Sequence, residues 1–118
     1  MNNRELDALI AEKVFGYEKH EGFNHEPIFL HDDGIVYPAA DYSTNIMDAW
    51  LVLQRMGKLK YDVHIITNGN VAQVLCVIPR RPSFIIAHQS PTKAICLAAL
   101  KAVEDALQST NGLNKCNY

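Results

Sequence analysis

The sequence predicts an α/β domain of the α+β type, a helix-sheet-helix sandwich with a mostly antiparallel sheet and three main helices. Three segments place apolar residues at three- and four-residue steps, and two stretches between them are apolar or alternating around turn residues. A length of 118 residues suits one domain. We therefore expect a single sandwich domain over residues 1–108 and a flexible C-terminal tail over the polar, unpatterned residues 109–118.

The first helix is expected at the N-terminus, where Asn2 or Asn3 can cap its free amides and Gly16 can end it. Its packing face would hold four apolar residues at helical spacing: Leu6, Leu9, Ile10 and Val14. Residues 17–26 have no clear period and predict a loop. A short hairpin should follow, because Asp33-Gly34 separates two apolar runs.

The central helix is predicted over about residues 44–56, with Ser43 or Thr44 as its N-cap and Gly57 as a left-handed C-cap. Its apolar residues recur at helical steps: Ile46, Ala49, Trp50, Leu53 and Met56. A large aromatic residue on such a stripe usually belongs to the core. We therefore expect Trp50 to be buried and not to serve as a platform for a ligand.

A second hairpin is predicted after this helix. Residues 58–66 alternate apolar and polar side chains, and Asn68-Gly69 suits a type I′ turn. The returning strand, residues 71–78, is apolar on both faces apart from Gln73, so it should be central in the sheet and covered on both sides. Residues 83–87 predict a further strand.

The last helix should begin with Ser90 as N-cap and Pro91 as its first residue. Its packing face is rich in alanine, which permits close approach to a sheet or another helix. The residues of this face are Ile95, Ala98, Ala99, Ala102, Val103, Ala106 and Leu107.

Composition excludes several classes of partner. A net charge of −2 and a pI near 6.2 provide no basic field for nucleic acid. No apolar run reaches the roughly 18 to 20 residues of a membrane span. The three cysteines form no Cys-x-x-Cys pair, and a polar N-terminus replaces a signal peptide, so we expect a reduced, intracellular protein. No motif predicts a cofactor.

One group of polar residues predicts a ligand site on either side of the strand 83–87. Its members are Arg80, Arg81, His88, Gln89, Ser90 and Thr92. If the strand brought the arginines close to the start of the last helix, guanidinium groups, free amides and the helix dipole would together bind phosphate or carboxylate. In the alternative, the arginines only solvate a loop and Ser90 only caps the helix.

A second group, His31, Asp32, Asp33 and His64, would form a metal-dependent hydrolase or nuclease site if the four side chains converged. The first three are equally typical of a solvated turn, because aspartate binds neighbouring amides there. The histidines match no metal motif and no enzyme signature occurs, so we expect no catalytic residue and no metal ligand.

Three segments, residues 3–16, 42–50 and 90–102, resemble the small bacteriophage and prophage proteins grouped as the phage ABA sandwich domain. The resemblance spans most of the chain, from the first helix to the last. It implies a helix-sheet-helix sandwich, a phage origin and a setting in the host cytoplasm. No catalytic residues come with it.

Three functions remain as hypotheses. The favoured one is a phage accessory protein that acts by binding in counter-defence, either inhibiting a host protein or sequestering a phosphorylated nucleotide released as an immune signal. A protein partner would meet an exposed patch with Phe23, Phe29 or Tyr37. The alternatives are the hydrolase described above and a structural or virion-assembly component, which requires a large oligomer. A homo-oligomer is compatible with the first hypothesis, and no membrane partner is expected.

Overall fold

The computed structural model describes the backbone of residues 1–116 and the side chains of residues 1–106. Its α-helices are α1 (Asn3–Leu9), α2 (Ile46–Lys58) and α3 (Pro91–Cys116), and α1 continues into a π-helical segment, η1 (Ile10–Val14). A 3₁₀ turn, η2, spans Phe23–His25. The strands are β1 (Glu18–Glu21), β2 (Pro27–Leu30), β3 (Val36–Tyr37), β4 (Asp62–Asn68), β5 (Val71–Val77) and β6 (Phe84–His88).

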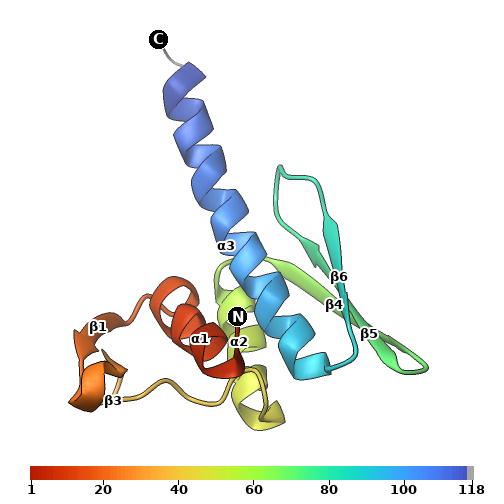
Figure 1. Cartoon of the computed structure of the whole chain (residues 1–118). Coiled ribbons are helices and arrows are strands. Elements are labelled where there is room, and N and C mark those ends of the chain that lie inside the picture. Colours follow the sequence, from red (N-terminus) through yellow and green to blue (C-terminus); the bar gives the residue numbers. More distant parts are fainter. Residues whose placement is uncertain (117–118) are drawn as a thin grey trace.

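The predicted α+β class, with three main helices and antiparallel strands, is confirmed. The described strands form two three-stranded antiparallel sheets, in the orders β1-β2-β3 and β4-β5-β6. Figure 1 shows the helices gathered between these two sheets, with α3 running alongside the second sheet. Both hairpins that were predicted from their turn residues are present.

The core lies where α3 packs on β5 and β6 while η1 and α2 pack against α3. Alanines on α3 allow this close approach, because a small side chain lets two backbones come near each other. The most deeply buried residues are Leu6, Ile10, Ala11, Val14, Phe29, Ala49, Val52, Met56, Val74, Cys76, Ala94, Ile95, Cys96, Ala98, Ala99 and Ala102.

The start of the first helix follows local chemistry. The side chain of Asn2 accepts a hydrogen bond from the amide of Glu5 at 2.8 Å, so Asn2 is the N-cap. The π-helical segment η1 then widens the helix by one residue, as the amide of Phe15 donates to the carbonyl of Ile10 at 3.1 Å. Gly16 ends the segment with φ of +70°, as predicted from its type.

Strand β1 lies within the segment that was predicted to be a loop. All four of its residues are exposed, so its sequence carries no alternation of polar and apolar side chains. It pairs with β2 at a sheet edge, from Glu18 opposite Leu30 to Glu21 opposite Pro27. The backbone pairing with β2 therefore defines this strand, and periodicity could not reveal it.

Helix α2 differs from its prediction at both ends. Its N-cap is Asn45, whose side chain accepts from the amides of Met47 at 2.9 Å and Asp48 at 3.3 Å. Gly57 lies inside the helix, and the left-handed residue after it is Lys60, with φ of +70°. The sequence alone did not identify the N-cap, because Ser43, Thr44 and Asn45 are all residue types that cap helices.

The prediction that Trp50 is buried is wrong, because 57% of this residue is exposed. The buried face of α2 consists of Ala49, Val52 and Met56. Apolar residues of α2 fit three- and four-residue steps along two adjacent stripes, and Trp50 belongs to the outer one with Ile46. Helical periodicity alone does not decide which stripe faces the core.

Strand β5 is central in its sheet, as predicted, but only one of its faces is buried. Ala72, Val74 and Cys76 point towards α3, whereas the alternate residues are only partly covered. No helix in the described part of the chain packs on that second face. The turn before β5 is also different, since Gly69-Asn70 is its central pair and only Gly69 has a positive φ. This is the pattern of type II′ and not of type I′.

Helix α3 begins as predicted, with Pro91 first and the amide of Lys93 donating to Ser90 Oγ at 3.3 Å. Its backbone is helical as far as Cys116, which includes most of the segment predicted to be a tail. The tail's last two residues and its side chains lie outside the described residues. Among the helices described, none has the length and apolar character to cross a membrane.

Candidate functional site

A pocket of 520 Å³ lies between α2 and the turn that joins β2 to β3. We call it the aromatic pocket. Its lining combines aromatic rings, carboxylates and two cations: Phe15, Tyr17, His31, Asp32, Asp33, Tyr37, Ala40, Tyr42, Asp48, Leu51, Gln54, Arg55 and Lys58. Separate elements supply these side chains, namely the end of η1, the β2–β3 hairpin, the segment before α2 and α2 itself.

Five rings form a continuous ladder along one wall of the aromatic pocket. His31 and Tyr37 stack face to face, with centroids 3.6 Å apart and planes at 3°. Tyr17 lies 4.9 Å from His31 at a tilt of 48°. Phe15 stacks between Tyr17 and Tyr42, at 5.3 Å and 5.1 Å. Such spacing is favourable for ring pairs, and it gives the wall a rigid apolar surface.

Hydrogen bonds fix the orientation of His31. The ring nitrogen Nε2 lies 3.1 Å from the carbonyl oxygen of Tyr37. Because a carbonyl can only accept, Nε2 carries the hydrogen and donates it. His31 is only 8% exposed, so this bond and the stack together hold β3 and the turn in place.

The two aspartates of the turn bind tyrosine hydroxyls. Tyr17 donates to Asp32 Oδ2 and Tyr37 donates to Asp33 Oδ2, each at 3.3 Å. Burial raises the pKa of Tyr17, and the charge of Asp32 and the bond to it raise it further. The hydroxyl of Tyr17 therefore stays protonated and remains a hydrogen-bond donor at neutral pH.

Tyr42 is the most buried ring in this wall. Burial raises its pKa well above the usual value of 10.0, with further increases from the charges around it. Its hydroxyl is therefore neutral throughout the physiological range, and it contributes apolar and hydrogen-bonding surface without charge.

Helix α2 supplies the basic side of the aromatic pocket. Arg55 Nε donates to the carbonyl of Val14 at 3.0 Å, which fixes the guanidinium against the end of η1. Within the described residues, no hydrogen bond or ion pair engages its terminal nitrogens. Lys58 lies one turn further along α2 and is exposed. Neither cation forms an ion pair with a carboxylate of the described residues, so an anion entering from this side would meet both positive charges.

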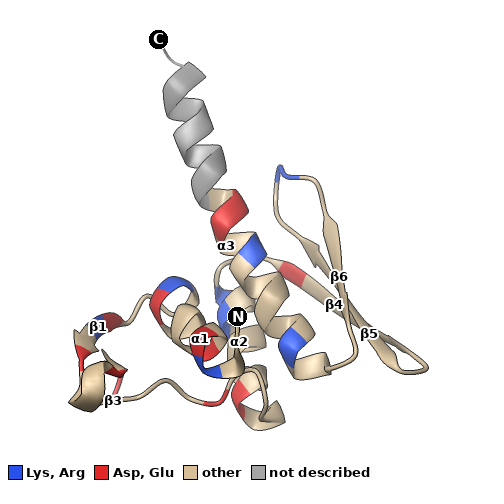
Figure 2. Ribbon diagram, viewed as in Figure 1, with Lys and Arg blue, Asp and Glu red and all other residues tan. Residues whose placement is uncertain are grey.

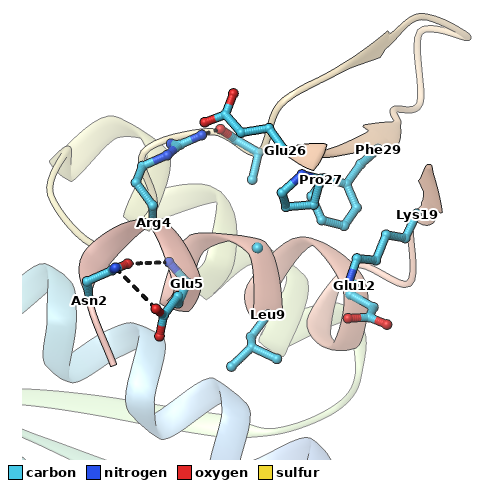
Figure 3. Close-up of a pocket in the computed structure, with 11 residues that line it drawn as sticks. Asn2, Arg4, Glu5, Leu9, Glu12, Lys19, Glu26, Pro27 and Phe29 are labelled. Carbon is cyan, nitrogen blue, oxygen red and sulfur yellow. Dashed lines mark hydrogen bonds between the residues drawn. The ribbon is translucent and has the colours of Figure 1, made fainter. Parts of the chain in front are cut away.

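A second pocket, of 360 Å³, lies between α1 and β2 (Figure 3). Its floor is apolar, with Leu9, Pro27 and Phe29, and its rim is charged. At one end of the rim the groups are engaged, because Asn2 donates to Glu5, and Arg4 donates to Asp41 Oδ1 at 3.1 Å. The aromatic pocket combines stacked rings with two cations, and it is therefore the better candidate for a polar ligand.

The residues of the predicted anion site do not all come together. His88, Ser90 and Thr92 are neighbours at the start of α3, where the amide of Ser90 donates to His88 Nδ1 at 2.9 Å. Arg80 and Arg81 lie in the β5–β6 loop, at the other end of the five-residue strand β6. Figure 2 shows the basic tip of that loop far from the start of α3.

The polar groups at the start of α3 are engaged within the protein. Thr92 Oγ1 donates to the carbonyl of Ser43 at 2.6 Å and lies 3.0 Å from Ser90 Oγ. These bonds attach α3 to the segment before α2. Gln89 is exposed beside them. The strand β6 spans roughly 17 Å, because each residue of a strand advances about 3.3 Å, so the arginines and this helix start form two separate places.

The hydrolase hypothesis required His31, Asp32, Asp33 and His64 to converge. The first three line the aromatic pocket, whereas His64 is exposed on β4, in the other sheet. Asp33 also accepts a hydrogen bond from the amide of Ile35 at 3.0 Å, which is the turn role that was the alternative. No group of three or more possible ligands among the described side chains is arranged to hold a metal ion.

The remaining sequence candidates are placed as follows. Phe29 is fully buried, whereas Phe23 is 94% exposed and Tyr37 is 40% exposed. Cys76 and Cys96 are buried, and burial raises their pKa values to about 11 and about 12. Both thiols are therefore protonated and unreactive near neutral pH, as predicted from their apolar neighbours.

Comparison with known proteins identifies the family. The model of the phage ABA sandwich domain matches residues 8–100, which is most of the chain. The chain belongs to this family. Every residue that lines the aromatic pocket falls inside the matched region of the phage ABA sandwich domain.

One solved structure is similar over nearly the whole molecule. The crystal structure of a phage protein from Bacillus cereus ATCC 14579 has a TM-score of 0.69 and 29% sequence identity, and the match covers 85% of this chain and 90% of that chain. No curated protein matches the chain. The comparisons thus support a phage origin and assign no activity.

Proposed function

We propose that this phage ABA sandwich protein acts by binding in the host cytoplasm, and that it sequesters a phosphorylated nucleotide which the host uses as an immune signal. The aromatic pocket supports this proposal, because stacked rings, two cations and three carboxylates line its 520 Å³. A volume of this order suits a small organic ligand. Its phage family is consistent with a role in counter-defence.

Each part of a nucleotide has a matching group in the pocket. A base has a flat face that stacks on tyrosine or histidine rings. Phosphate oxygens pair with the terminal nitrogens of Arg55 and with Lys58. Ribose hydroxyls donate hydrogen bonds, and Asp48 offers a carboxylate near them that already accepts from the amide of Asp41 at 3.0 Å.

The charges of the pocket restrict the ligand. Three aspartates line it against one arginine and one lysine, so the formal balance is one negative charge with histidine neutral. A chain of several phosphates would be repelled, because like charges in a partly closed site cost free energy. We therefore expect a ligand with few phosphate charges and an exposed base and ribose.

Isothermal titration calorimetry tests the proposal with adenosine 5′-monophosphate and cyclic adenosine monophosphate as probes. Adenosine and ribose 5-phosphate are the controls, since each lacks one of the two groups that the pocket recognises. We expect the nucleotides to bind and Lys58→Ala to weaken binding by roughly tenfold, the effect of one charge-assisted contact. Arg80→Ala/Arg81→Ala should bind like the wild type. Loss of binding in this double variant with retention in Lys58→Ala would move the site to the β5–β6 loop.

A host protein as the partner is the second candidate. The observation in its favour is Phe23, which is 94% exposed on η2, directly before the left-handed residues Asn24 and His25. Aromatic side chains are enriched at protein–protein interfaces, and a largely exposed one is a candidate for docking into a partner's pocket. Affinity capture from host lysate with the wild type and Phe23→Ala distinguishes this function, because only the wild type should retain the partner.

A further inference from the structure

The outer surface of α2 carries an apolar stripe that nothing in the described chain covers. We call it the α2 stripe. Its members are Ile46 at 62% exposure, Met47 at 72%, Trp50 at 57% and Leu51 at 44%. Side chains of this size have roughly 200 Å² of surface each, so the α2 stripe exposes on the order of 450 Å². A monomeric protein rarely leaves an apolar patch of this size without a function.

We propose that the α2 stripe packs against the same stripe of a second copy of this chain, with the two helices antiparallel about a two-fold axis. A standard interface buries about 800 Å² on each partner, of which somewhat more than half is apolar. The apolar area of the α2 stripe matches that share. This inference does not depend on the proposed ligand.

The charges of α2 fit an antiparallel partner. Asp48 is in the first turn, while Arg55 and Lys58 are in the last turn. In an antiparallel pair each acidic end lies beside the basic end of the other helix. The helix dipoles are then also opposed, which favours the pair. A parallel pair, whose two-fold axis runs along the helices, would place like charges together, so the charges select the antiparallel pair, whose two-fold axis is perpendicular to the helices.

Gly57 leaves space on α2 for the tryptophan of a second copy. It follows Trp50 by two helical turns, so both lie on the same side of α2. No heavy atom lies within 4 Å of a Cβ built on Gly57, and this side of the helix is therefore open. When the axis passes midway between the two residues, the indole of each copy lies over Gly57 of the other. A bulky side chain at position 57 would occupy the space that the indole of the other copy needs.

The α2 stripe is adjacent to the aromatic pocket, because its member Leu51 also lines that pocket, together with Arg55 and Lys58 of the same helix. A second copy on α2 would therefore stand beside the pocket entrance. The outer face of β5 is another uncovered apolar surface, with Ile85 of β6 beside it at 57% exposure. This β5 face does not have an acidic group at one end and basic groups at the other, as α2 has, and so a substitution on it serves as the control for the dimer test.

Sedimentation velocity of the full chain, over a roughly hundredfold range of concentration, measures the association. We expect a dimer that dissociates on dilution, with the emission of Trp50, the chain's only tryptophan, shifting to longer wavelength as it does so. Trp50→Glu should be monomeric with an unchanged circular dichroism spectrum. Ile85→Glu, matched to it in exposure, should remain a dimer.

A charge exchange tests the antiparallel arrangement separately. Lys58→Glu and Asp48→Lys should each weaken the dimer by roughly tenfold, because each loses two symmetric pairs, and the double variant should recover the wild-type affinity. A chain that is monomeric at every concentration overturns the proposal. So does a dimer that survives Trp50→Glu, a dimer that is lost in Ile85→Glu, or a larger assembly.

Discussion

His31 connects the fold of the β2–β3 hairpin to the wall of the aromatic pocket, and two substitutions separate its contributions. His31→Ala removes the stack on Tyr37, the contact with Tyr17 and the bond to the Tyr37 carbonyl. A ring pair contributes about 0.5 to 1.5 kcal/mol and a neutral hydrogen bond about 1 kcal/mol. Two ring pairs and one hydrogen bond are lost, so we expect the free energy of unfolding to fall by about 2 to 4 kcal/mol. His31→Phe keeps a ring in the stack and loses only the donor, so its cost should be about 1 kcal/mol.

Urea unfolding followed by circular dichroism measures both values. For a chain of 118 residues the loss in His31→Ala corresponds to roughly 8 to 16 °C in the melting temperature. His20→Ala is the control, because the side chain of His20 is 45% exposed on the edge strand β1. It should change stability by less than about 0.5 kcal/mol. Equal effects of His31→Ala and His20→Ala, or of His31→Ala and His31→Phe, would refute the assigned contacts.

Three further substitutions or titrations test other parts of the structure. Asp7 is buried and accepts from the amide of Ser43 at 2.8 Å, so Asp7→Ala should cost about 2 kcal/mol in chemical unfolding, and the exposed Asp41→Ala less than about 1 kcal/mol. Gly57→Ala should raise the melting temperature of the monomer by an amount equivalent to about 0.5 to 1 kcal/mol, because the position is helical and open; a decrease would show that the space is filled. Burial raises the pKa values of Cys76 and Cys96 from 9.0 to about 11 and about 12. As pH rises, these thiols therefore ionise in the unfolded chain before they ionise in the folded protein. Their contribution to the free energy of unfolding is complete below pH 9 and decreases as pH rises from 9 towards 12. Iodoacetamide at pH 8 should label these two thiols only after unfolding, and equally fast labelling of the native protein would contradict their burial.

Local chemistry predicted the parts of the fold in which neighbouring residues decide the structure. Asn2 as an N-cap, the pair Ser90-Pro91 at the start of α3 and the hairpin around Gly69 each depend on contacts a few residues apart. Strand β1 was missed because only its pairing with β2 defines it. The burial of Trp50 was mispredicted because the second apolar stripe of α2 has no covering partner within the described chain.

The candidate site was visible in the sequence only in part. His31, Asp32 and Asp33 were recognised together because they are adjacent in the chain. Their partners in the aromatic pocket, such as Tyr17 and Arg55, come from other elements, and no sequence spacing connects them. Arg80 and Arg81 were predicted to lie close to Ser90 and Thr92, which are near them in sequence. The extended strand β6 between the two groups keeps them apart.

The π-helical segment η1 determines where the rings after it point. A π turn contains one residue more than the α-helical path between the same ends, and here that extra residue precedes Phe15 and Tyr17. If Ile10–Val14 wound as a regular α-helix with no residue removed, everything downstream would turn by about 100° around the helix axis. Two members of the ring ladder would then leave their places, although no pocket residue had been altered. A deletion of one residue from this segment should therefore restore regular winding and keep the ring ladder in place, because the π turn already absorbs that residue.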